Sequence, residues 1–175
     1  KSDSQTLGLL LRHPVYRKPG EEIGIGLLFE RKWSKTELLG ERFSFAEGVD
    51  DGKSDVSALR LTQDWLKRSR NRVLAARSAF SFGLDILGAT DNDSKPDGEF
   101  FHWLGQFQWA ERIFGNSEVI FRADAQLTQD PMLPMEKFVV GGADTVRGSR
   151  ENQLVRDNGR VASLELLVPV LPKHP

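Results

Sequence analysis

Side chains of alternating polarity recur along this chain, and the alternation limits what it can fold into. The clearest stretch is residues 101–109, where the odd positions hold Phe, Trp, Gly, Phe and Trp and the even positions hold His, Leu, Gln and Gln. Successive side chains of a β-strand point to opposite faces of its sheet, so this pattern predicts a strand with one apolar and one polar face. No run of about 18 apolar residues occurs, so no transmembrane helix is expected.

The same alternation predicts strands elsewhere in the chain. The expected segments are residues 6–12, 23–33, 42–47, 59–65, 71–87, 119–127 and 163–170. Turn-forming stretches separate them, such as Lys18-Pro19-Gly20 and Asp157-Asn158-Gly159. The sequence therefore predicts an all-β fold, an antiparallel meander of about eight or nine strands.

Two features favour a transmembrane barrel over a soluble β-sandwich. The segment 71–87 is long for a strand of a globular protein. All four Trp residues fall in register with the apolar set, mostly near strand ends, as in a membrane-interface girdle. On alternation alone, both folds remain open. In a barrel, the opposite face would line a wet lumen with these polar residues: Arg77, Asp85, His102, Gln106, Gln108, Arg122, Asp124, Gln126 and Glu165.

A glycine-rich segment at 138–149 carries the most specific motif. Taken alone, it predicts a hairpin loop with an exposed arginine. Its surroundings extend the pattern: Leu133–Phe138, then Gly141-Gly142, Val146-Arg147-Gly148, Asp157-Asn158-Gly159 and the strand 162–169. This arrangement resembles the haemolysin secretion/activation family, the transporters of two-partner secretion. The resemblance covers roughly residues 55–170.

The resemblance implies a sixteen-stranded barrel whose Val-Arg-Gly loop folds back into the lumen. Arg147 would hold that loop against the wall, because a guanidinium offers five fixed donors. Gly141, Gly142 and Gly148 would permit the sharp chain path, with Val146 beside the arginine. Ser149 stands where the family usually has an aromatic residue. Residues 1–175 would form a partial C-terminal barrel domain, without the periplasmic polypeptide-transport-associated domains and the last barrel strands.

The function implied by this resemblance is an outer-membrane pore that translocates an unfolded partner exoprotein. Its expected partners are that exoprotein and outer-membrane lipid, and the barrel would be monomeric. One alternative is a barrel-assembly protein of the same superfamily. The other is a soluble β-sandwich binding module.

Other chemistry has little support in the sequence. Lys and Arg total 24 against 25 Asp and Glu, so the net charge of −1 gives no argument for nucleic acid binding. Cysteine is absent, and His13, His102 and His174 lack ligand spacing, so neither a metal nor a cofactor is expected. Asp85 and Asp124 could approach each other across strands, but no cleft is indicated for an acid–base pair. We therefore expect no enzymatic activity.

Overall fold

The computed structural model describes residues 2–39, 41–44, 48–49, 51–92, 96–141 and 154–169. Its longer strands are β1 (Ser2–Lys18), β2 (Glu21–Leu38), β4 (Lys53–Arg68), β5 (Arg72–Leu84), β6 (Phe101–Arg112), β7 (Glu118–Thr128) and β10 (Gly159–Leu167). Its short elements are β3 (Glu41–Arg42), β8 (Phe138–Val140) and β9 (Leu154–Arg156), with 3-10 turns η1 (Phe114–Asn116) and η2 (Pro134–Glu136). No helix in the described part of the chain is long and apolar enough to cross a membrane.

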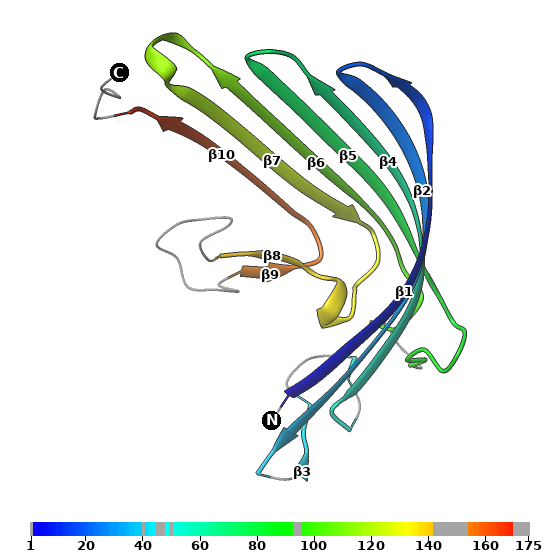
Figure 1. Ribbon diagram of the computed structural model, residues 1–175. Helices are drawn as coiled ribbons and strands as arrows, with labels where there is room; N and C mark the ends of the chain where they lie inside the picture. The colour runs from blue at the N-terminus through cyan, green and yellow to red at the C-terminus, as the bar shows by residue number, and fades with distance from the viewer. Residues whose placement is uncertain are drawn as a thin grey trace.

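The long strands form one curved antiparallel sheet in the order β1-β2-β4-β5-β6-β7-β10, with β3 paired to β2. Figure 1 shows the second, two-stranded sheet of β8 and β9 lying in the hollow of the large one. The expected all-β antiparallel meander is therefore confirmed. The strand expected over 42–47 is wrong in extent, because only β3 forms there and 45–47 lie outside the described residues. The strand expected over 71–87 ends at Leu84.

The two faces of the large sheet differ in chemistry, as the alternation predicts. Directly paired residues point to the same face, so the register places Leu61, Phe80, Trp103 and Leu127 in one row across four strands. This row lies on the convex face, which carries a band of exposed apolar side chains: Leu9 and Leu164 are 66% and 71% exposed. A continuous exposed apolar surface of this kind indicates contact with a partner or a membrane.

The connections differ between the two ends of the strands. At one end, short turns join β1 to β2, β4 to β5 and β6 to β7. At the other end, long connections join β2 to β4, β5 to β6 and β7 to β10. Trp65 and Trp109 lie toward the short-turn end of the strands, and Trp33 and Trp103 lie toward the long-connection end. Short turns at one end and longer loops at the other are typical of outer-membrane barrels, where the longer loops are extracellular.

Candidate functional site

The site is built by the connection between β7 and β10, which enters the hollow of the sheet as an inner hairpin. We use "inner hairpin" for the paired strands β8 and β9, and "neck" for residues 129–137 and 157–158, where the connection leaves and rejoins the sheet. β8 pairs with β9 from Phe138 opposite Arg156 to Val140 opposite Leu154.

Apolar packing fixes the first leg of the neck to the concave face. Met132 and Leu133 are fully buried and form a core with Val56 and Ala58 of β4 and with Phe100. Met135 packs against this core from the edge. Full burial of two large side chains stabilises the docked leg by about 3–6 kcal/mol relative to leaving them in water.

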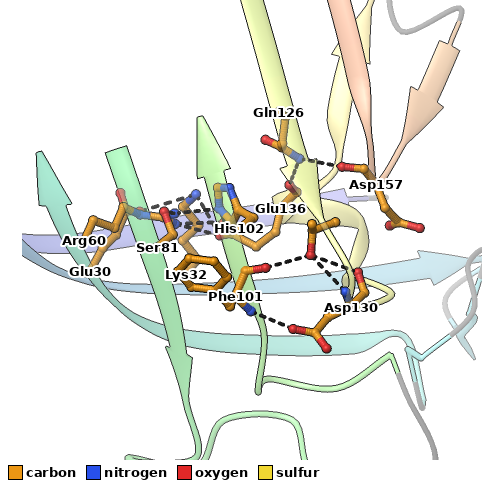
Figure 2. Close-up of polar contacts among 11 residues, drawn as sticks. Glu30, Lys32, Arg60, Ser81, Phe101, His102, Gln126, Asp130, Glu136 and Asp157 are labelled. Carbon is orange, nitrogen blue, oxygen red and sulfur yellow. Dashed lines mark hydrogen bonds and ion pairs between the residues drawn. The ribbon is translucent and has the colours of Figure 1, made fainter. Parts of the chain in front are cut away.

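A buried group of charges lies immediately beyond this core; we call Glu30, Lys32, Arg60, His102 and Glu136 the ionic cluster (Figure 2). Arg60 Nη2 donates to both carboxylate oxygens of Glu136, each at 2.9 Å. Lys32 Nζ lies 3.1 Å from Glu136 Oε1, and Arg60 also binds Glu30 through Nε at 3.1 Å. The two carboxylates Glu30 and Glu136 are thus paired with the lysine and the arginine of the cluster.

Neighbouring strands position these side chains because they lie in cross-strand register. Arg60 pairs directly with Ser81, and Ser81 pairs directly with His102, so all three point into the hollow at one level. Arg60 Nη1 donates to Ser81 Oγ at 2.8 Å and lies 3.3 Å from His102 Nε2. The wall therefore helps to hold the guanidinium where Glu136 contacts it.

Glu136 is ionised in this setting. Its side chain is only 3% exposed. Burial raises the pKa of Glu136, but the His102 ring and the positive charges of Arg60 and Lys32 outweigh burial and lower the pKa to about 2. A buried charge with such partners is costly to separate from them, so the cluster strongly disfavours release of the neck.

A second set of contacts, which we call the clasp, ties the two legs of the neck to each other and to β7. The buried Gln126 Nε2 donates to the carbonyl oxygens of Glu136 at 3.0 Å and Asp157 at 3.1 Å. Figure 2 shows this single amide between the two legs. Asp157 Oδ1 accepts from the Met132 backbone amide at 3.1 Å. Asn158 and Thr128 exchange two hydrogen bonds at 2.7 and 3.1 Å.

Two glycines lie next to the strands of the inner hairpin: Gly159 contacts the start of β8, and Gly141 follows its end. The Phe138 ring occupies the space that a Cβ at Gly159 would fill, so the first leg packs closely on the start of β10. Gly141 has φ of 136°, a backbone conformation that other residues rarely adopt. The remaining motif residues Gly142, Val146, Arg147 and Gly148 lie outside the described residues, so their role stays a prediction.

Most of the expected lumen-facing residues lie on the concave face. Arg77 Nε is 3.3 Å from Asp64 Oδ1, and Gln106 Nε2 donates to Asp124 Oδ1 at 3.1 Å. Arg122 Nη1 donates to Glu165 Oε1 at 2.6 Å. Gln108 is paired with Arg122 in register and shares its face. The concave face beside the inner hairpin is therefore a belt of paired opposite charges.

Asp85 departs from this expectation. It is exposed and follows the end of β5, so it does not belong to the strand wall. Asp124 is level with Arg77, because both pair with Gln106, and Arg77 lies eight positions before Asp85 on the chain. The two aspartates therefore do not form an acid–base pair. Among the residues that the structure describes, no three His, Asp or Glu side chains are grouped as metal ligands would be.

The ionic cluster and the clasp were not recognised from sequence as one site. His102 and Gln126 were expected to face the hollow, and they do. The sequence pattern predicted no role for Lys32, Arg60 or Glu136. The available signals were a charged residue alternating with leucines at Leu59-Arg60-Leu61 and a glutamate inside the block that leads to the glycine motif.

Fold and site together define a class of protein: a wall of an antiparallel β-barrel that carries a hairpin docked on its inner face. Comparison with known proteins agrees. The family model "Haemolysin secretion/activation protein ShlB/FhaC/HecB" matches residues 1–175, and the chain belongs to this family.

A solved structure with the same fold is CdiB from Escherichia coli. The match has a TM-score of 0.81 at 19% sequence identity and covers 94% of this chain and 30% of the CdiB chain. A search of the curated proteins found no match.

Proposed function

We propose that this chain is part of an outer-membrane pore that exports an unfolded partner exoprotein. The observation that carries the proposal is the inner hairpin, held on a polar concave face of a sheet whose convex face is apolar. An apolar outer surface suits lipid, and a polar inner surface suits a water-filled path. Membership of the haemolysin secretion/activation family supports the same reading.

The concave face also suits passage of a polypeptide. Its charges are paired with one another, as Arg77 with Asp64 and Arg122 with Glu165, so a passing chain meets no field of one sign. Such a surface binds a moving polypeptide weakly. We propose that no chemistry is performed on the substrate and that no nucleotide, metal or other cofactor takes part.

The inner hairpin is the element that would control this path. Arg147 lies between β8 and β9 in the sequence, and the family resemblance gives this arginine the role of holding the loop. We propose that the pore is narrowed while the inner hairpin is docked and widens when the hairpin moves. The exoprotein and the surrounding lipid are the partners, and the barrel acts as a monomer.

A direct test uses the full-length protein that contains this chain, produced in a Gram-negative host together with the exoprotein encoded beside it. We expect exoprotein in the medium only when both are present. Arg147→Ala should reduce export while the barrel still shows its heat-dependent shift in gel mobility. Arg156→Ala, an exposed arginine on β9, is the matched control and should export normally.

The other outcomes separate the alternatives. Normal export by Arg147→Ala would remove that residue from the mechanism. Defective assembly of many outer-membrane proteins on depletion, with export unaffected, would indicate a barrel-assembly protein. A protein that stays monomeric in buffer without detergent would be a soluble binding module. That last outcome is disfavoured by the convex face, because no second sheet covers it within the described residues.

A further inference from the structure

A cationic hollow lies on the convex face, away from the inner hairpin. It lies at the long-connection end of β2 and β4 and has a volume of about 340 Å³. It is lined by Arg31, Trp33, Ser34, Lys35, Lys53 and Asp55. The register puts Lys35 directly opposite Lys53 and Arg31 directly opposite Ser57, all on the convex face. Three cations are therefore gathered on two adjacent strands.

This arrangement is unfavourable for the protein alone. Like charges directly opposite each other on a sheet repel. Among the described residues, none of Arg31, Lys35 and Lys53 takes part in an ion pair within 4 Å. Arg31 lies over the Trp33 ring at 5.6 Å, and its Nε atom is buried with no hydrogen-bond partner in the described part of the chain. A bound anion would supply what these groups lack.

The carboxylates nearby leave a positive balance. Asp55 lies opposite Trp33, and Asp3 of β1 lies opposite Lys35 on the same face, so the patch carries three positive and two negative charges. Glu37 is the next convex residue of β2, and it pairs in register with Arg42, which offsets it.

The position of the hollow along β2 identifies the kind of anion that it would bind. On β2 the convex residues Ile23, Ile25, Leu27 and Phe29 form an apolar run, and Arg31, Trp33 and Lys35 follow it without a gap. The hollow thus begins where the apolar band ends. A tryptophan at that level marks the boundary between hydrocarbon and headgroups. Arginine and lysine bind phosphate oxygens through charge-assisted hydrogen bonds.

We infer that Arg31, Trp33, Lys35 and Lys53 form a binding site for the phosphate group of a phosphorylated glycolipid in the outer leaflet. Its acyl chains would lie along the apolar run that ends at Phe29. The inference rests on the proposed insertion in the outer membrane, because it needs the convex face to meet lipid.

The test compares three forms of the full-length protein in detergent, with bound lipid counted by native mass spectrometry. The probe is lipid A carrying both of its phosphates. The site variant is Arg31→Gln/Lys35→Gln/Lys53→Gln. The matched control is Lys18→Gln/Lys67→Gln/Arg68→Gln, which removes three cations at the short-turn end of the strands. We expect the site variant to bind lipid A about 100-fold more weakly than the unchanged protein, and the control to bind it normally.

Two further probes distinguish the source of the anion. Lipid A stripped of phosphate should bind all three forms equally weakly, and inorganic phosphate should not displace lipid A at equal concentration. Equal binding of lipid A by the site variant would overturn the inference, as would displacement by inorganic phosphate. Insertion into vesicles is measured separately, and a protein that does not insert would overturn the proposed function itself.

Discussion

Arg60 and Glu136 are separated by 76 residues in the sequence and are joined by two hydrogen bonds of 2.9 Å inside the hollow of the sheet. Arg60 belongs to the sheet wall and Glu136 to the neck, so this ion pair holds the neck of the inner hairpin on the wall. The contacts of Gln126 on both legs place the fixed part of the connection at residues 129–137 and 157–158. These contacts tie the neck to the wall, so the proposed movement of the hairpin would begin beyond the neck.

The first prediction concerns loss of the Glu136 charge. Glu136→Gln removes the more buried of the two carboxylates that pair with Arg60 and Lys32, and breaking a buried ion pair costs about 3–5 kcal/mol. We expect the neck to undock while the barrel stays folded. The measurement is maleimide labelling of Ala58→Cys, a position fully buried beneath the neck in a chain without other cysteines.

The labelling rate should rise by about 100-fold or more when Glu136→Gln is added. Glu165→Gln is the matched control, since it removes a carboxylate bound to Arg122 away from the neck. Labelling that stays as slow as in Ala58→Cys alone would show that the apolar core holds the neck without the charges.

The second prediction is a pH dependence with a definite sign. The pKa of Glu136 is lowered from 4.5 to about 2 in the folded protein. A group whose folded pKa is depressed contributes stability above its unfolded pKa and loses it as pH falls through the folded pKa. The contribution of about 3 kcal/mol is therefore constant from pH 7 to about pH 5 and declines between about pH 4.5 and pH 2.

Thermal unfolding of the full-length protein and of Glu136→Gln, measured side by side, isolates this effect, because the two proteins share every other charged group. The difference between the two midpoints should be flat above pH 5 and should narrow in more acidic buffer. A difference that instead widened on acidification would show that the carboxyl group is protonated in the native protein.

The third prediction concerns the clasp. Gln126→Met keeps the size of the side chain but leaves the Glu136 and Asp157 carbonyl groups without this donor, at about 1–3 kcal/mol for each buried group. We expect faster hydrogen–deuterium exchange in residues 131–138 and 154–158. Gln108→Met, on the exposed part of the same face, should leave that exchange unchanged. The clasp would have no role if the two variants exchanged alike.

The sequence allowed prediction of the strands and their faces because both depend on neighbouring residues. Side-chain direction alternates with a period of two, so the apolar set at 101–109 and 119–127 specifies one face wherever the strand pairs. Strand ends were less predictable. The alternation through Asp85 continues past Leu84, but the backbone leaves the sheet there.

The site could not be predicted in the same way. Glu136 sits in a 3-10 turn between two apolar stretches, and its pattern is that of a solvated residue. Only the return of the chain into the hollow brings it to Arg60, and that path depends on contacts distant in sequence. The family motif indicated that a loop folds inward, but not that the neck before it carries a buried charge.

The last prediction tests the assignment of the two faces. Phe107 and Gln106 are neighbours on β6, and the register puts Phe107 beside Ala123 on the convex face and Gln106 beside Asp124 on the concave face. Phe107→Arg places a charge in lipid and should cost about 2–4 kcal/mol near the bilayer midplane. Gln106→Arg adds a charge next to Asp124 in the polar belt and should be close to neutral. The measurement is unfolding in guanidinium chloride from phospholipid vesicles, with each variant made in the full-length protein. Equal losses of stability would mean that both positions meet the same environment, and the convex face would then not be the lipid face.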